Sequence, residues 1–117
     1  YARMGAHTLI HKRTEDDIWK NLFELPLVET EKDLSEEEFL ACPQFHALFA
    51  EGEVRMVRTL LRGVKHVLSH RVIYTNFYEV TLPDNSSSFS SYQRVAVEDL
   101  GRYAVPRLIH AFLEKYV

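Results

Sequence analysis

The fold of this chain is decided by residues 64–82, which read VKHVLSHRVIYTNFYEVTL. Both ends of this stretch are rich in Val, Ile, Tyr, Thr and Phe, residue types that are enriched in β-strands. The stretch therefore predicts two strands, one at residues 64–67 and a longer one at residues 72–82. Residues 68–71 between them are expected to form a turn with Ser69 and His70 at its tip.

Residues 54–61, directly before this stretch, suit two kinds of structure. The apolar positions follow helical spacing, and they are Val54, Val57, Leu60 and Leu61. The β-branched residues of the same segment are also typical of a strand. The pattern therefore does not distinguish a helix from a strand here.

Further strands are expected towards both ends of the chain. Residues 1–4 and 8–12 are predicted to form a β-hairpin around Gly5, which can adopt the positive φ of a tight turn. Residues 93–97 are predicted to form another short strand. Because these strands are separated by helical segments, we expect a sheet assembled from distant parts of the chain.

Helices are expected at two places. Ser35 and Glu38 have the spacing of a capping box, which begins a helix, and Pro43 should break or restart it. Pro106 is suited to the first turn of a C-terminal helix. That helix has an apolar stripe made of Leu108, Ile109, Phe112, Leu113 and Tyr116. The order of elements predicts an α+β fold, an α/β/α sandwich with a mixed sheet.

Length and composition indicate one folded domain over residues 1–117. The hydrophobic fraction is 46% and the charged fraction 26%, both ordinary for a globular chain. No apolar run reaches the roughly 18–20 residues that span a bilayer, so no membrane partner is expected. Cys42 is alone, which excludes an intrachain disulfide and favours a reducing, cytoplasmic location.

Charge is divided sharply along the chain. Residues 14–53 contain twelve acidic residues against two lysines, whereas residues 54–71 contain no acid and five bases, Arg55, Arg58, Arg62, Lys65 and Arg71. The net charge is −3, so this local basic strip marks one face for an anion, and nucleic acid is the commonest large anion. The alternative is two differently solvated faces without a ligand.

The usual signatures of phosphate and metal binding are missing from the sequence. The four glycines stand far apart, so no glycine-rich phosphate loop is present. Glu36, Glu37 and Glu38 occupy consecutive helix positions, which point about 100° apart and cannot share one ligand set. A solvated helix N-terminus explains them better, and no metal site is predicted.

Residues 19–26 read WKNLFELP and resemble the Trp-x-Phe-Pro element of Nudix domains. In that family two glycines typically follow, where this chain has Leu27 and Val28. The Nudix box should then carry Arg-Glu-x-x-Glu-Glu on one helix to hold magnesium, but residues 35–42 read SEEEFLAC. The resemblance implies a Nudix-like fold without pyrophosphate hydrolysis.

Two further segments are KHVLSH at residues 65–70 and YAVPRLI at residues 103–109. Together with the Nudix-like element, they resemble the C-terminal domain of the A/G-specific adenine DNA glycosylases, the MutY family. The turn of that family usually reads Phe-Ser-His and contacts 8-oxoguanine opposite the target adenine. The resemblance therefore implies that Leu68, which stands in place of Phe, and Ser69 and His70 recognise the lesion.

The resemblance also implies that the chain is the C-terminal part of a longer glycosylase of base-excision repair. In that family a separate N-terminal domain carries the catalytic residues and usually an iron–sulfur cluster. No catalytic residue and no cofactor are therefore expected in this domain. Its expected partners are that catalytic domain and double-stranded DNA with 8-oxoguanine opposite adenine, whose phosphates would be contacted by Arg62, Lys65 and Arg71.

Two other functions are compatible with the sequence. One is a stand-alone Nudix hydrolase of oxidised nucleotides that uses unusual metal ligands. The other is a protein-interaction module that binds a basic partner through the acidic face. Magnesium-dependent release of pyrophosphate would support the first, and retention of a basic partner without any effect on DNA would support the second.

Overall fold

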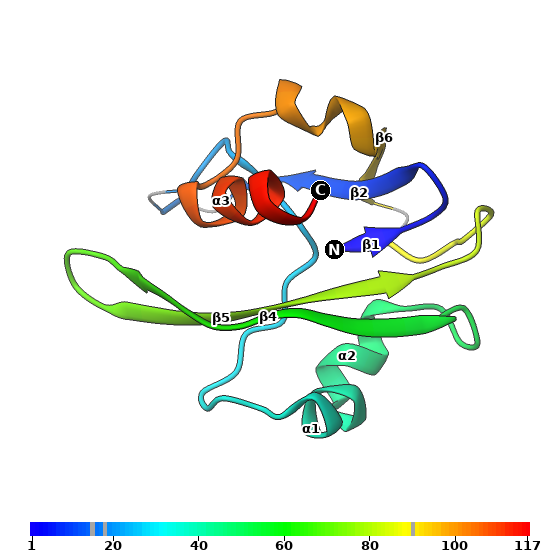
Figure 1. Cartoon of the computed structure of the whole chain (residues 1–117), viewed down its shortest axis with the longest axis horizontal. Coiled ribbons are helices and arrows are strands. Elements are labelled where there is room, and N and C mark those ends of the chain that lie inside the picture. The colour runs from blue at the N-terminus through cyan, green and yellow to red at the C-terminus, as the bar shows by residue number, and fades with distance from the viewer. Residues whose placement is uncertain (15, 18, 90) are drawn as a thin grey trace.

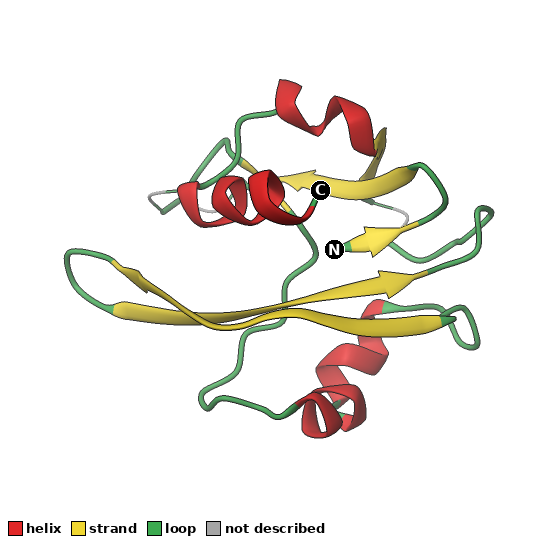
Figure 2. Ribbon diagram, viewed as in Figure 1, coloured by secondary structure: helices red, strands yellow, loops and turns green. Residues whose placement is uncertain are grey.

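The structure is a computed structural model, and it describes residues 1–117 except residues 15, 18 and 90. Within these residues the strands form two three-stranded sheets (Figure 2). The first sheet has the order β1-β5-β4 and consists of Ala2–Arg3, Val72–Thr81 and Met56–Val67. The second has the order β3-β2-β6 and consists of Phe23–Glu24, His7–Lys12 and Gln93–Ala96. The first sheet is mixed, because β1 pairs with β5 in parallel while β4 pairs with it antiparallel.

Helices lie on both sides of the β4–β5 hairpin (Figure 1). Helices α1 (Glu36–Ala41) and α2 (Pro43–Leu48) cover one face. Helix α3 (Arg107–Tyr116), the 3₁₀ helix η1 (Val97–Arg102) and the second sheet lie on the other side. This layering confirms the α+β prediction of helices packed on either side of a mixed sheet.

The predicted helix boundaries are largely confirmed. The Ser35 hydroxyl accepts a hydrogen bond from the Glu38 N–H, and the Glu38 carboxylate accepts one from the Ser35 N–H, each at 3.1 Å. Pro43 begins α2 after Cys42 has left the helical conformation. Helix α3 starts at Arg107, one residue later than expected, because Pro106 has the extended ψ of 150°.

The ambiguous segment before the turn is a strand. From Met56 it continues without interruption into the predicted strand at residues 64–67, and together they form the single strand β4. The register with β5 shifts between Thr59 and Leu61 and again between Leu61 and Val64. Each shift adds a residue without a direct partner and moves the following side chains to the other face. The apolar spacing therefore resembles that of a helix although the backbone is extended.

Two apolar clusters hold the hairpin in place. On the α3 side, the ring of Phe112 stacks on Phe77 with their centroids 4.2 Å apart. On the α1 side, the ring of Phe39 stacks on Tyr78 at 4.4 Å. The half of the hairpin near β1 is thus packed between helices, while the end with the turn extends beyond them (Figure 1).

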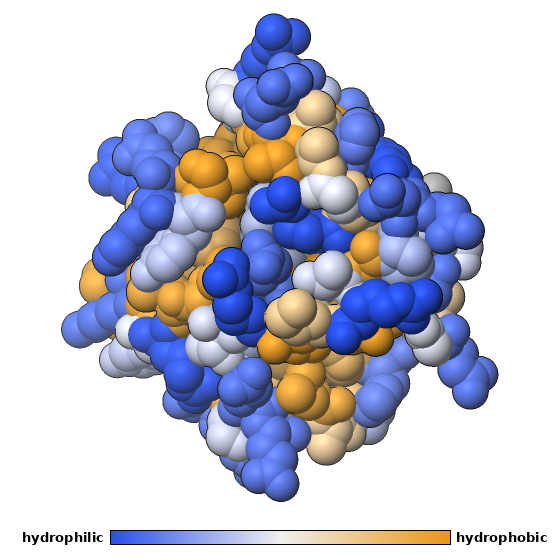
Figure 3. Space-filling model, turned by 45° about the vertical axis from the view of Figure 1, so that its right-hand side comes forward, coloured by the Kyte–Doolittle hydropathy of each residue, from blue (hydrophilic) through white to orange (hydrophobic). Residues whose placement is uncertain are grey.

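The surface mixes hydrophobic and hydrophilic residues. On the face shown in Figure 3, hydrophobic areas are small and are separated by hydrophilic side chains. Among the residues that the structure describes, no helix is long and apolar enough to cross a membrane.

Candidate nucleic-acid interface

The predicted turn lies at the free end of the β4–β5 hairpin (Figure 1). The Leu68 N–H donates a hydrogen bond of 2.8 Å to the Arg71 carbonyl and closes the turn. Leu68 is half-buried, whereas Ser69 and His70 are exposed. Within the described residues, the backbone N–H groups of Ser69 and His70 have no acceptor. The turn therefore presents two free donors and a hydroxyl group to a ligand.

The three expected phosphate contacts differ in their surroundings. In the described part of the chain, the exposed side chains of Lys65 and Arg71 form neither an ion pair nor a hydrogen bond. Arg62 instead lies 3.3 Å from the Asp33 carboxylate and donates hydrogen bonds to the Leu34 carbonyl and the Tyr78 hydroxyl. Arg62 thus holds the segment before α1 against the hairpin, and a phosphate would have to compete with Asp33 for it.

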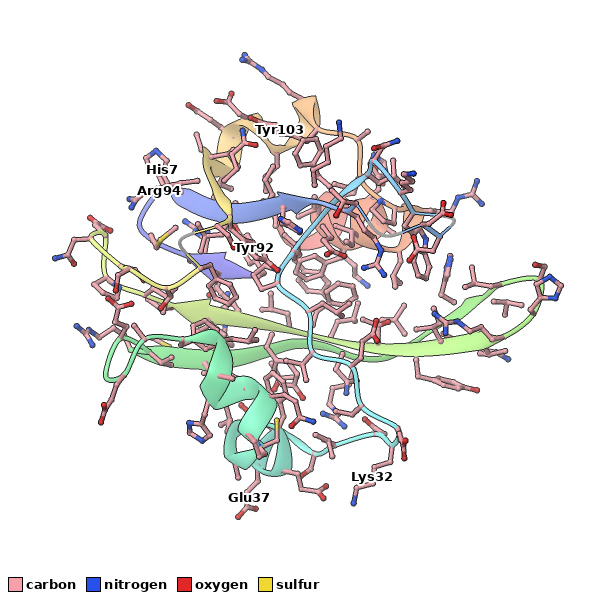
Figure 4. The ribbon with its side chains drawn as sticks, turned by 180° about the vertical axis from the view of Figure 1, so that it is seen from behind. His7, Lys32, Glu37, Tyr92, Arg94 and Tyr103 are labelled. Carbon is pink, nitrogen blue, oxygen red and sulfur yellow. The ribbon has the colours of Figure 1, made fainter. Side chains whose placement is uncertain are left out.

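Free positive charge within the basic strip is concentrated near the turn. Residues 54–78 contain no acid. At the far end of the strip, Arg58 pairs with Glu79 at 3.1 Å and Arg55 donates to the Gly52 carbonyl. Other basic side chains, such as His7 and Arg94, lie at the opposite end of the molecule from the turn (Figure 4). The turn region is therefore the part of this strip whose basic side chains make no ion pair among the described residues, and Asp17 is the acid that the charge of Arg71 reaches.

A second group of charged side chains, centred on Arg13, lies near the turn. Arg13 lies 2.7 Å from Asp17 and 2.9 Å from Glu24, and its guanidinium lies 5.6 Å from the centre of the Trp19 ring. The hydrogen bond from Arg13 lowers the pKa of Asp17, and the charge of Arg71 lowers it further. The side chain of Trp19 does not lie in the apolar core. It is only half-buried and belongs to neither apolar cluster, because it packs under Arg13.

A cavity of about 720 Å³ follows β5 beside the turn. Its wall runs from Trp19 and Arg71 past Pro106 and Ile109 at the beginning of α3 to Phe39 and Phe45 on the α1 and α2 side of the hairpin. Ligand cavities of small molecules commonly have this size and a largely apolar wall.

Metal ligands do not converge in the part of the chain that the structure describes. No group of three or more His, Cys, Asp or Glu side chains there is arranged to hold a metal ion. In α1, Glu38 is engaged in the helix cap, where hydrogen bonds from Ser35 lower its pKa. Glu37 points away from the sheet, as Lys32 does on the preceding segment (Figure 4).

Two features of this region were not predicted from the sequence. Asp33 lies 29 residues from Arg62, and no local pattern links them. Tyr74 was expected only as a strand residue, yet its side chain is 66% exposed. Residues 72–82 were predicted only as a strand, without an assignment of its two faces.

Comparison with known proteins identifies the family. The family model described as NUDIX domain matches residues 1–115. The chain therefore belongs to the NUDIX domain family, which confirms the Nudix-like fold expected from residues 19–26. No curated protein matches the chain.

Proposed function

We propose that this NUDIX domain recognises 8-oxoguanine opposite adenine in duplex DNA, as part of an adenine glycosylase of base-excision repair. The observation that carries the proposal is the exposed turn of Ser69 and His70 at the end of a hairpin whose nearest charges are the unpaired Lys65 and Arg71. Such a projection can reach the edge of a base while the basic residues hold the phosphates.

The chemistry of the lesion explains how the turn would distinguish it. Oxidation at C8 of guanine converts N7 from a hydrogen-bond acceptor into an N–H donor and adds a carbonyl oxygen. The Ser69 hydroxyl can donate or accept, so it discriminates weakly by itself. A backbone carbonyl of the turn would accept from N7–H, and a free backbone N–H would donate to the new carbonyl. The proposed reader is therefore Ser69 with the backbone around it, assisted by Leu68 and His70.

This domain would work together with a catalytic domain of the same parent chain. In this proposal the domain holds the oxidised base in the duplex while the opposite adenine is flipped into the catalytic domain. Arg71 and Lys65 would fix the position of the DNA without reading its sequence. The iron–sulfur cluster of the resembled family would belong to that other domain.

The proposal can be tested by NMR titration of this chain at low salt. The duplexes carry adenine opposite either 8-oxoguanine or guanine. We expect lesion-dependent amide shifts centred on residues 68–71. Identical shifts with both duplexes, spread over the basic strip, would show that the domain binds DNA phosphates without recognising the lesion.

A double substitution tests the turn itself. Ser69→Ala with His70→Ala is expected to weaken the preference for the lesion duplex and to leave the urea midpoint unchanged, because both side chains are exposed. His46→Ala, which removes an exposed histidine on α2, is the matched control and should keep the preference. An unchanged preference in the double variant would show that the reader is elsewhere.

Hydrolysis of an oxidised nucleotide is the second candidate function. Membership of the NUDIX family favours it. Magnesium-dependent release of pyrophosphate from 8-oxo-dGTP by the intact chain would establish this activity. A chain that binds lesion duplexes and releases no pyrophosphate would exclude it for this nucleotide.

A further inference from the structure

The two faces of the β4–β5 hairpin differ near its turn. Residues directly opposite each other in an antiparallel pair lie on the same side of the sheet, and Val67 pairs with Val72 as Lys65 pairs with Tyr74. These four side chains, which we call the tip face, therefore lie on one side, and all four are exposed. The exposed fraction is 65% for Val67, 44% for Val72 and 66% for Tyr74.

The opposite side of the same segment is partly covered. It carries the pairs His66–Ile73 and Val64–Thr75, and each of these residues is half-buried. Val64 packs against the apolar cluster that contains Phe112. The exposure of the tip face is therefore specific to one side of the hairpin.

The tip face is exposed to solvent because the elements that cover this side of the sheet end before they reach it. Alternate residues of a strand share a face, so Tyr74, Asn76 and Tyr78 lie on the same side of β5. Tyr78 is covered by the ring of Phe39, and the Asn76 side chain donates a 2.9 Å hydrogen bond to Asp33. Tyr74 lies beyond both contacts, and Figure 1 shows the hairpin extending past α1 and α2.

The charge around the tip face favours an anionic partner. Lys65 is part of this face, Arg71 adjoins it at Val72, and residues 54–78 contain no acid. Glu29, Glu31 and Asp33 lie on the cavity wall along the β5 edge, and Asp33 accepts a hydrogen bond from Asn76, two residues from Tyr74. A polyanion is therefore guided to the side of β4, where Lys65 lies.

We propose that the tip face lies against the backbone of a DNA strand, with Tyr74 packed on a deoxyribose and Lys65 on a neighbouring phosphate. The backbone of duplex DNA alternates phosphate charges with the apolar edges of sugars, whatever the sequence of the bases. The inference rests on the proposed function in requiring that the chain binds DNA. It adds a contact that is independent of the lesion, because sugars and phosphates are the same beside guanine and 8-oxoguanine.

The test measures binding of the whole chain by fluorescence anisotropy at several salt concentrations. The duplexes carry 8-oxoguanine or guanine opposite adenine. Tyr74→Ala is expected to weaken both complexes by about fivefold, because the apolar contact of the ring with the deoxyribose is lost. The salt dependence should stay unchanged, because tyrosine is uncharged. Lys65→Ala should instead reduce the slope of log K against log salt by about 1.

Two control variants make the result specific. Tyr74→Phe keeps the ring and should bind like the unmodified chain. Met56→Ala removes a side chain that is 59% exposed at the other end of β4, and it should have no effect. The urea midpoint of each variant establishes that the fold is retained.

The outcomes separate this inference from lesion recognition. If Tyr74→Ala binds both duplexes like the unmodified chain, the proposed contact between the tip face and DNA is overturned, and the proposal of lesion recognition stands. If the unmodified chain shows no lesion preference but Tyr74→Ala still weakens binding, the proposed contact between the tip face and DNA is supported, and the proposal of lesion recognition is overturned. Failure of the unmodified chain to bind either duplex overturns both.

Discussion

At the scale of single residues, Arg62 belongs to the basic strip, yet its side chain bonds to other parts of the protein itself. It joins the hairpin to the segment before α1 through Asp33, Leu34 and Tyr78. Its side chain is 38% exposed and that of Asp33 is 66% exposed, so solvent screens much of their attraction. The hydrogen bonds to Leu34 and Tyr78 are therefore expected to supply a large share of what Arg62 contributes to the stability of the fold.

We predict that Arg62→Ala lowers the free energy of unfolding by about 1 kcal/mol. Asp33→Ala should cost a similar amount, because it removes the acceptor of both Arg62 and Asn76. Urea unfolding of the two variants and of the double variant measures the coupling, which should be below about 1 kcal/mol. If Arg62→Ala has unchanged stability but weaker DNA binding, Arg62 acts on phosphate rather than on the fold.

At the scale of an element, the β4–β5 hairpin depends on its irregular positions. Gly63 has a φ of 66° at the second register shift, and its N–H donates a 2.7 Å hydrogen bond to the Asn76 side chain. An added Cβ at Gly63 would meet no atom within 4 Å. The cost of a larger residue is therefore conformational, since residues other than glycine disfavour this region.

We predict that Gly63→Ala destabilises the protein by about 1 kcal/mol and changes the amide shifts of the hairpin end. Gly101 in η1 also has free space around its Cα but no positive φ. Gly101→Ala is therefore the matched control and should be close to neutral. Equal urea midpoints for the two variants would contradict the conformational explanation.

At the scale of the whole molecule, Glu53 joins two loops that are distant in the sequence. Its carboxylate accepts hydrogen bonds from the hydroxyls of Ser88 and Ser86, at 2.7 and 2.8 Å, and from the Ser87 N–H at 3.1 Å. These hydrogen bonds, with that of the Ser88 hydroxyl the largest, lower the pKa of Glu53 from 4.5 to about 2. The carboxylate thus connects the start of β4 to the loop between β5 and β6.

The lowered pKa predicts a pH dependence of stability. The contribution of Glu53 is fully present above its unfolded pKa of 4.5 and is lost as the pH falls towards 2. Glu53→Gln should therefore be less stable than the unmodified chain at pH 7, and this difference should shrink between pH 4.5 and pH 2. Urea midpoints at several pH values measure it.

Glu51→Gln provides the control for this pH dependence. Glu51 is exposed and makes no hydrogen bond or ion pair within the residues that the structure describes. Its substitution should have little effect at any pH. A Glu53→Gln difference that stays constant down to pH 2 would contradict the role of the ionised carboxylate.

The sequence pattern of neighbouring residues determined many of the local structures of this protein. The capping box at Ser35 and Glu38, the restart at Pro43 and the turn at residues 68–71 all follow from neighbouring residues, because caps and turns are closed by short-range hydrogen bonds. The strand-rich stretch after the turn and the apolar stripe of α3 predicted the α+β class. The order of motifs also predicted the Nudix-like fold, and it raised the proposal of lesion recognition.

Only the tertiary structure decided which side chains are covered. The two register shifts in β4 place apolar residues on both faces of the sheet, so that spacing along the chain no longer reports burial. The pairing of Arg62 with Asp33 and the exposure of Tyr74 depend on where the segment before α1 crosses the hairpin. Burial and ion pairing are set by neighbours that are distant in the chain, and these neighbours exist only once the sheet and the helices have packed together.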